Sequence, residues 1–378
     1  MPKPAEPTAK FPHKTPVLTV VYTLSTILLY LRTRSGPPRP GGKPSSAMKV
    51  IVDQAIPFLK GVLEPFAEVC YRPGREFTPE EVRTADALVI RTRTRCDSRL
   101  LEGSRVGMIA TATIGFDHID LAWCARHGIE VATAAGCNAR GVLQWVGAVL
   151  ATLARREGWR PEERTLGIVG VGHVGSLVKS YAEAWGFRVV CCDPPREERE
   201  RCGFLPLEEV ARQADLLTFH TPLDASTRHM ADARLFRTMR RSATVINSSR
   251  GEVVDGQALS KSGLKWVLDV WEHEPALDPV LLDGALLATP HIAGYSLQGK
   301  ANATALAVAA LSRHFGLPLE EWYPPQVERS VPRPVSWEEL CRTIPQHYDI
   351  EAESARLKQH PEAFESLRDN YAYRREYF

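Results

Sequence analysis

The sequence has almost no excess of charge, no C-x-x-C pair and no apolar run long enough to cross a membrane. Its 47 lysines and arginines balance 45 aspartates and glutamates, so the net charge is only +2, and no basic stripe suggests nucleic-acid binding. Its eight cysteines lack the spacing of zinc or thioredoxin-type sites. We therefore expect no metal site and no nucleic-acid partner, and cysteines kept reduced as in a cytoplasmic enzyme.

The longest apolar run, Val17–Leu31, has 15 residues, whereas a spanning helix needs about 20. Its basic flanks and the Pro/Gly/Ser-rich stretch that follows give it the proportions of a signal peptide. Met48, however, opens a clean strand pattern, MKVIVD. We expect residues 1–47 to be a disordered extension, or to lie upstream of the true start, rather than to direct export. No membrane partner is expected.

From Met48 onward, strand and helix patterns alternate. A first series has strands at 49–53, 87–91, 106–111 and 130–132, with helices at 56–66 and 121–127. A long helix at 138–156 separates it from a second series of strands at 165–169, 189–193, 216–220, 244–247, 266–270 and 286–288. This β-α-β rhythm predicts two Rossmann-like, doubly wound α/β domains with parallel sheets and a cleft between them.

The segment GIVGVGHVGS contains the strongest motif. Gly170, Gly172 and Gly175 make G-x-G-x-x-G between a strand and a helix, and Asp193 ends the next strand 18 residues later. This pattern binds a dinucleotide, with the phosphates on the helix N-terminus and the acid on the ribose, which favours NAD over NADP. The turn would also bring His173 and Val174 to the cofactor. The alternative is a structural glycine turn with an incidental aspartate.

Three later residues follow strands of the second series and predict hydride transfer at a 2-hydroxy acid. Arg250 would hold the substrate carboxylate, His291 would take the hydroxyl proton, and Glu274 would orient the imidazole. Taken singly, each residue also has a structural explanation. Arg250 could form a surface ion pair, His291 could be a structural histidine, and Glu274 could belong to a Glu-Pro turn. Glu272 and His273 are weaker candidates, and Asp269 would face the nicotinamide amide.

The order of the glycine turn, N-x-x-R-G, D-V-W-x-x-E-P and P-H-I-A-G resembles the D-2-hydroxyacid dehydrogenases. The resemblance implies substrate contacts by Thr92, Thr113 and Tyr295. It adds cofactor contacts by Thr221, Ser248, Asp269 and Gly294. It also implies a substrate-binding domain (48–142 and 290–316, with a helix at 297–315), an NAD-binding domain (143–289), and a small, shortened α+β C-terminal region (317–378) that makes a homodimer.

The segments TATIGFDHID and FESLRDNYAYRREY are similar to a branch of that family that oxidises a phosphorylated four-carbon 2-hydroxy acid. For the phosphate, the candidates are Arg91, Arg93 and Arg95 at the end of one strand, or Arg374 and Arg375 in the tail. The alternative for the three strand-end arginines is a solvated basic edge without a ligand. Some positions depart from the family pattern. Gln144 replaces an expected Glu, Ser248-Ser249 replace Ala-Cys, and residues 256–266 look shortened.

Two other readings remain open. One is a different D-2-hydroxyacid enzyme, such as a glyoxylate/hydroxypyruvate reductase or a phosphoglycerate dehydrogenase. The other is an NAD-sensing binding protein without turnover, against which the presence of Arg250, Glu274 and His291 argues, since fold alone does not decide function.

Overall fold

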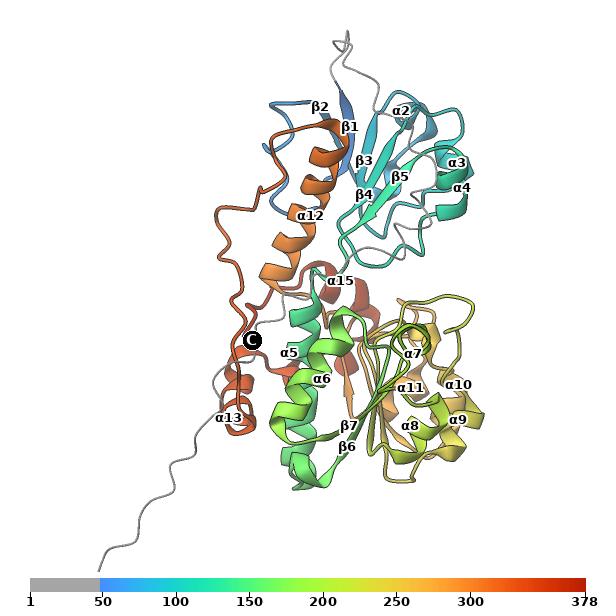
Figure 1. Cartoon of the computed structure of the whole chain (residues 1–378), viewed down its shortest axis with the longest axis vertical. Helices are drawn as coiled ribbons and strands as arrows, with labels where there is room; N and C mark the ends of the chain where they lie inside the picture. The colour runs from blue at the N-terminus through green and yellow to red at the C-terminus, as the bar shows by residue number, and fades with distance from the viewer. Residues whose placement is uncertain (1–47) are drawn as a thin grey trace, which may run out of the picture. The chain divides into compact units, whose positions relative to one another are not determined.

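The computed structural model describes residues 48–378, and the predictions made for residues 1–47 lie outside that range. Within it, the chain forms two parallel β-sheets with helices packed on them (Figure 1). The predicted α/β class is confirmed. None of the helices between Met48 and Phe378 is long and apolar enough to cross a bilayer.

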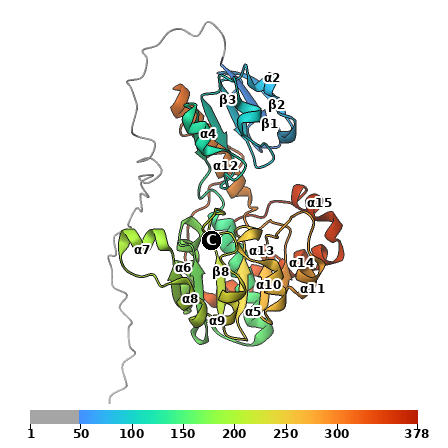
Figure 2. The same ribbon diagram turned by 90° about the vertical axis from the view of Figure 1, so that its right-hand side faces the viewer.

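The first sheet has five parallel strands in the order β2-β1-β3-β4-β5. They are β1 (Lys49–Asp53), β2 (Glu68–Arg72), β3 (Ala87–Ile90), β4 (Met108–Thr111) and β5 (Glu130–Thr133). The short helices α2 (Pro79–Val82), α3 (Ser98–Leu101) and α4 (Leu121–Arg126) lie between them in sequence. Helix α12 (Leu297–Phe315) returns from far along the chain to pack on this sheet (Figure 2). All residues of β3 and β4 are buried, as expected for strands covered on both faces.

The second sheet has six parallel strands in the order β11-β10-β9-β8-β6-β7. They are β6 (Thr165–Val169), β7 (Arg188–Cys192), β8 (Leu216–Phe219), β9 (Thr244–Asn247), β10 (Lys265–Leu268) and β11 (Leu287–Ala288). Its helices are α5 (Ala139–Glu157), α6 (His173–Trp185), α7 (Pro194–Glu200), α8 (Leu207–Gln213), α9 (Ala233–Thr238), α10 (Gly256–Lys261) and α11 (Pro279–Gly284). Strand β6 lies between β7 and β8, so the strand order reverses there. The turn after β6 therefore occupies the position where such sheets bind ligands.

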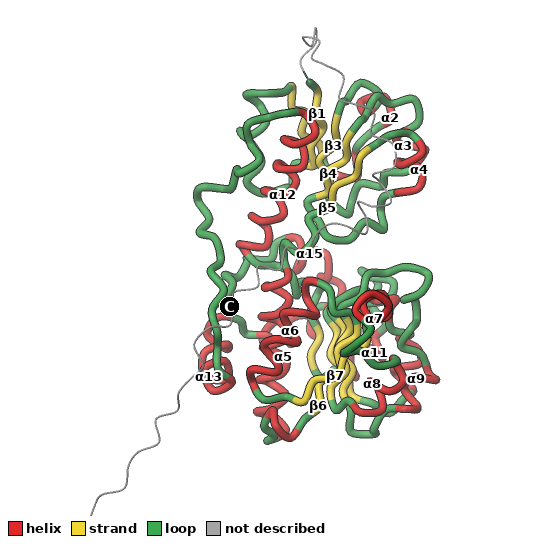
Figure 3. The backbone as a smooth tube through the Cα atoms, viewed as in Figure 1, coloured by secondary structure: helices red, strands yellow, loops and turns green. Residues whose placement is uncertain are grey.

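The C-terminal region differs from the predicted α+β region. Residues 317–336 form neither helix nor strand and lead from α12 to α13 (Figure 3). The helices that follow are α13 (Trp337–His347), α14 (Ile350–Gln359) and α15 (Phe364–Asp369). Residues 317–378 contain no strand, and their one β contact is an isolated bridge between Ser296 and Arg374. Helix α13 packs against α5, and the Ser354 hydroxyl of α14 accepts a hydrogen bond from Ala288 N at 2.9 Å.

The helix predicted at 56–66 does not form. Its apolar spacing was read correctly, because Ile56, Leu59 and Leu63 are all buried. The backbone instead makes successive turns, since Pro57 and Pro65 lack amide donors and Gly61 adopts a left-handed φ of 87°. Strand β2, which immediately follows these turns, was not predicted from the sequence.

Candidate active site

The glycine turn joins the end of β6 to the start of α6. A side chain at Gly175 would place its Cβ 2.0 Å from the carbonyl oxygen of Gly170, so only glycine lets the helix approach the turn this closely. At Gly172, in contrast, a Cβ would meet nothing within 4 Å, so the backbone there faces open space. Asp193 holds the turn in place, because its Oδ2 accepts a hydrogen bond from Val171 N at 2.7 Å. The geometry leaves room for a ligand beside the turn.

Two hydroxyl groups at the carboxyl ends of this sheet have no hydrogen-bond partner in the described part of the chain. Within residues 48–378, the side-chain oxygens of Thr221 and Ser248 are both buried and unpaired. Both follow strands of the second sheet, β8 and β9, at their carboxyl ends. Buried hydroxyls are normally satisfied, so this pair fits a polar ligand lying across the strand ends, as a dinucleotide would.

Arg250 is held by the turn that follows β9. The Asn247 side-chain amide donates to the carbonyl oxygen of Arg250 at 2.8 Å, while its own oxygen accepts from Ser249 N at 3.0 Å. The guanidinium reaches across to the segment after β4. There a Cβ on Gly115 would lie 1.8 Å from Arg250 Nη2, and Asp117 Oδ2 is 3.6 Å from Nε. The motif that resembles the family, TATIGFDHID, thus lies beside Arg250.

Glu274 and His291 form a direct pair. Glu274 Oε1 lies 2.5 Å from His291 Nδ1, and both side chains remain about a quarter exposed. Burial acts to raise the pKa of Glu274, but attraction to His291 and Arg368 outweighs it and lowers that pKa. The imidazole therefore faces a carboxylate on one nitrogen and can exchange a proton through the other.

The loop that carries His291 is fixed by Asp269, at the end of β10. Asp269 is fully buried, and its carboxylate accepts hydrogen bonds from Thr289 Oγ1 at 2.6 Å, Ile292 N at 2.8 Å and Ala293 N at 2.9 Å. Its carbonyl oxygen also accepts from His291 N at 2.7 Å. These bonds hold His291 at a left-handed φ of 57°, which a non-glycine residue adopts only under such constraint.

Arg368, on α15, was missed by the sequence analysis. Its Nη1 lies 3.6 Å from Glu274 Oε1, and its Nε donates to the hydroxyl of Tyr295 at 3.1 Å. Tyr295 in turn packs under Lys300, whose Nζ is 3.5 Å from the ring centroid. Burial acts to raise the pKa of Tyr295, but these two cations and Arg91 lower it overall.

Known proteins are similar to this chain over most of its length. Residues 138–293 match the family model described as D-isomer specific 2-hydroxyacid dehydrogenase, NAD binding domain. An erythronate-4-phosphate dehydrogenase of Bacteroides fragilis is 46% identical over 341 residues, covering 87% of this chain and 97% of that protein. The chain belongs to the erythronate-4-phosphate dehydrogenase family. The resemblance noted in the motifs is thereby confirmed.

Further comparisons agree. An erythronate-4-phosphate dehydrogenase of Ectopseudomonas mendocina is 40% identical over 352 residues, covering 87% of this chain and 93% of that protein. Among solved structures, the NAD⁺-bound 3-phosphoglycerate dehydrogenase of Entamoeba histolytica has a TM-score of 0.61 at 23% identity, covering 76% of this chain and all of that one. The second likeness concerns the fold alone.

The remaining residues predicted for the site follow strands of both sheets. Thr113 Oγ1 is 2.6 Å from Thr111 Oγ1, while Thr92 is exposed just after β3. Gly294 lies against Asn138, where a Cβ would be 2.0 Å from the amide nitrogen. His173 lies beside Gly136, with 2.9 Å from its Nδ1 to a Cβ built there. Their contacts to substrate or cofactor remain predictions.

Of the basic residues suggested for the phosphate, the structure removes one. Arg374 is buried, and its Nη atoms donate to the carbonyl oxygens of Ile292, Gly141 and Ala293. It therefore cannot also bind a ligand, and its role is to hold the His291 loop. Arg375 is exposed.

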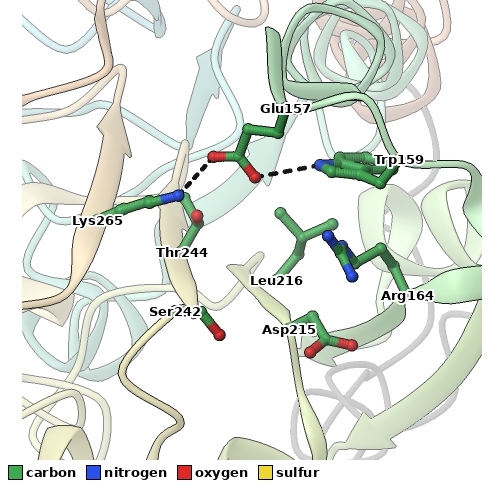
Figure 4. Close-up of a pocket in the computed structure, with 8 residues that line it drawn as sticks. All are labelled: Glu157, Trp159, Arg164, Asp215, Leu216, Ser242, Thr244 and Lys265. Atoms are coloured by element: carbon green, nitrogen blue, oxygen red, sulfur yellow. Dashed lines mark hydrogen bonds and ion pairs between the residues drawn. The ribbon is translucent and has the colours of Figure 1, made fainter. Parts of the chain in front are cut away.

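A pocket at the opposite edge of the second sheet has a different character (Figure 4). It has a volume of about 280 Å³ and lies at the amino ends of β8, β9 and β10. Two pairs of charged groups at this pocket are joined within the protein, Glu157 with Lys265 at 2.6 Å and Asp215 with Arg240 at 2.7 Å. Arg164 also lines the pocket, and its guanidinium carbon lies 5.6 Å from the ring centroid of Trp159. Neither pair is left with a charge for a ligand.

Proposed function

We propose that the chain oxidises the C2 hydroxyl of 4-phospho-D-erythronate to give 2-oxo-3-hydroxy-4-phosphobutanoate, with NAD reduced, as a step of pyridoxal 5′-phosphate biosynthesis. The observation that carries this proposal is the 2.5 Å pair of Glu274 and His291, within the residues that match a family NAD-binding domain. The names of the relatives at 40% and 46% identity supply the substrate.

In this mechanism Arg250 binds the substrate carboxylate through paired hydrogen bonds, which fixes the orientation of C2. His291 accepts the hydroxyl proton, and Glu274 stabilises the imidazolium that forms. Bound NAD supplies the acceptor for the hydride that leaves C2. In the reverse direction, His291 returns the proton to the carbonyl oxygen.

The NAD site is assigned to the carboxyl ends of the second sheet. Gly170, Gly172 and Gly175 would admit the pyrophosphate at the start of α6, with His173 and Val174 beside it. Asp193 would accept hydrogen bonds from the ribose and repel a 2′-phosphate, which favours NAD over NADP. The unpaired hydroxyls of Thr221 and Ser248 would meet the cofactor, near Asp269 and Gly294.

Thr92, Thr113 and Tyr295 would contact the substrate. We also infer a homodimer made through residues 317–378 and a cytoplasmic location, where the NAD pool is available. The division into a substrate domain (48–142 and 290–316) and an NAD domain (143–289) belongs to the same proposal.

The purified full-length chain tests this function directly. NAD-linked turnover of 4-phosphoerythronate, 3-phosphoglycerate and glycerate should be compared, with a 2-oxo acid present to reoxidise any tightly held NADH. We expect kcat/KM to be highest for 4-phosphoerythronate. A preference for 3-phosphoglycerate or glycerate would instead indicate one of the other D-2-hydroxyacid activities.

A His291→Asn variant is the control in the same assay. We expect it to lose turnover by a factor of at least about 100, while NADH binding, followed by fluorescence, is retained. If no substrate is turned over but NADH still binds to the wild type, the NAD-sensing alternative is favoured.

A further inference from the structure

Three cationic side chains from separate segments gather around Tyr295. Arg91 follows β3, Lys300 lies on α12, and Arg368 lies on α15. Lys300 Nζ is 3.5 Å from the Tyr295 ring centroid and 5.3 Å from that of Tyr373. Arg368 donates to the Tyr295 hydroxyl at 3.1 Å, and all three cations act on that hydroxyl to lower its pKa, against the effect of burial.

The charge of this cluster is not balanced. Arg91 pairs with Asp53 at 3.0 Å, and Arg368 shares Glu274 with His291. Lys300, in contrast, has no carboxylate within 4.0 Å among the residues that the structure describes. Burial is the main cause that lowers the pKa of Lys300, and repulsion from Arg91 and Arg368 adds to it, although Tyr295 acts the other way. An ammonium so enclosed is costly without an anion.

Lys300 nevertheless keeps part of its surface accessible, as do Arg91 at 28% and Arg368 at 18% of their side chains. Each of the three therefore keeps some surface that a ligand can contact. The other basic residues nearby differ from them. Arg93 is paired with Glu365 at 2.6 Å and Asp369 at 3.4 Å, and Arg95 is 84% exposed beside Asp97.

We propose that Lys300, Arg368 and Arg91 bind the phosphate group of the substrate. This assignment rests on the proposed function and replaces the broader set Arg91, Arg93 and Arg95. A phosphate monoester carries about −1.5 to −2 charge at neutral pH and offers three acceptor oxygens, which suits three converging donors.

The position of the cluster fits a short substrate. Arg368 contacts both Tyr295 and Glu274, and Glu274 contacts His291. A substrate with its C2 hydroxyl at His291 can therefore extend its far end to the cluster. Lys300 and Arg368 both lie outside residues 138–293, the part that matches the general NAD-binding family model. Selectivity for a phosphorylated acid thus comes from α12 and α15 rather than from the cofactor domain.

A Lys300→Gln variant of the full-length chain tests the assignment. kcat/KM should be measured for 4-phosphoerythronate and for erythronate, the same acid without phosphate. We expect a loss of about 10- to 100-fold for the phosphorylated substrate, the size of a charge-assisted hydrogen bond, and little change for erythronate. Inorganic phosphate should inhibit the wild type competitively and the variant more weakly. Arg95→Gln, which removes a paired surface charge, is the matched control and should behave as wild type.

The variant should fold, because it removes an unpaired and partly buried charge. We expect its Tm to equal or exceed that of the wild type. Lys300→Arg restores the charge and should recover part of the discrimination between the two substrates. Equal losses for both substrates, or no loss for either, would overturn the assignment.

These outcomes are distinct from failure of the proposed function. Suppose that the wild type oxidises 4-phosphoerythronate and that Lys300→Gln prefers it over erythronate as strongly as the wild type does. Only the phosphate assignment is then wrong. If the wild type has no such activity, the proposed function is wrong. The anion site is then judged by inorganic phosphate, which should raise the Tm of the wild type more than that of Lys300→Gln. An equal rise in both proteins would reject the site.

Discussion

Glu274 lies between two groups that both favour its charged form. Its Oε1 is 2.5 Å from His291 Nδ1 and 3.6 Å from Arg368 Nη1. Because these neighbours lower the pKa of Glu274 against the effect of burial, the carboxylate is ionised throughout the neutral range. Its contribution to stability is present above the usual range of a glutamate, about pH 4.3, and is lost only as the pH falls through the lowered pKa.

In Glu274→Gln, the imidazolium of His291 loses its negative partner. We expect kcat/KM to fall about 10- to 100-fold, as for loss of a charge-assisted hydrogen bond. The acid limb of the profile should change as well, because glutamine has no carboxylate whose lowered pKa can shape it. Measurement of kcat/KM between about pH 5 and 9 checks both effects. Glu272→Gln is the control, since Glu272 pairs with His229 instead. An unshifted profile in Glu274→Gln would show that this carboxylate does not act through His291.

The sequence predicted some residues of this site and not others, for a physical reason. Arg250, Glu274 and His291 each follow a strand of one sheet, so a regular pattern indicated that they would meet. Lys300 and Arg368 lie on helices, where a basic residue is usually solvated. Lys300 and Arg368 come together only because α12 and the C-terminal segment both lie against Tyr295. Arg368 does lie in FESLRDNYAYRREY, which is similar to one branch of the family, but that similarity does not indicate which of its residues reaches the site.

At the scale of elements, most strands could be predicted to within a residue or two, because their buried runs alternate regularly with helices. The exceptions are segments whose backbone is set by breakers or by tertiary contacts. Residues 56–66 bury a helix-like set of side chains but make turns around Pro57, Gly61 and Pro65. The C-terminal region was predicted to be α+β, but residues 317–378 form helices that pack on α5 and β11 and contain no strand.

Gly115 and Gly251 both lie where a neighbouring group leaves no room for a side chain. Their replacement by alanine should have different effects on activity and stability. In Gly115→Ala, the new Cβ meets the flexible ends of two side chains, Arg250 at 1.8 Å and Asp117 at 3.2 Å, so the guanidinium must move. We expect kcat/KM to fall about 10- to 100-fold with little change in Tm. In Gly251→Ala, the Cβ would lie 2.1 Å from the backbone carbon of Trp271. The backbone must shift there, so Tm should fall by several degrees, given about 1–3 kcal/mol for overpacking.

Steady-state kinetics and thermal unfolding of both variants check this contrast. Normal kinetics in Gly115→Ala would contradict the role of Arg250 in holding the substrate carboxylate. A wild-type Tm in Gly251→Ala would show that the turn tolerates the added methyl group.

At the scale of the whole described chain, the last residues close the site from outside both sheets. Phe378 is buried against α5 and α6, beside Trp185 and Tyr181. Tyr371 and Tyr373 pack edge-on against Tyr295, and Leu297 N donates to the carbonyl oxygen of Arg374 at 2.8 Å. The similarity of this tail to the family therefore has a structural basis within the chain itself.

Arg374 is the residue on which that closure depends most. Its guanidinium satisfies three carbonyl oxygens, two of which belong to the loop after His291, and it lies 4.3 Å from the ring centroid of Tyr348. In Arg374→Gln, the shorter side chain cannot reach all three, and each buried carbonyl left unpaired costs about 1–3 kcal/mol. We expect Tm to fall by at least about 5 °C and kcat to fall as the His291 loop loosens. Thermal unfolding, kcat and amide hydrogen exchange of residues 289–296 measure these effects. Arg375→Gln, one residue along and exposed, should match the wild type. If the two variants behaved alike, the tail would not support the His291 loop through Arg374.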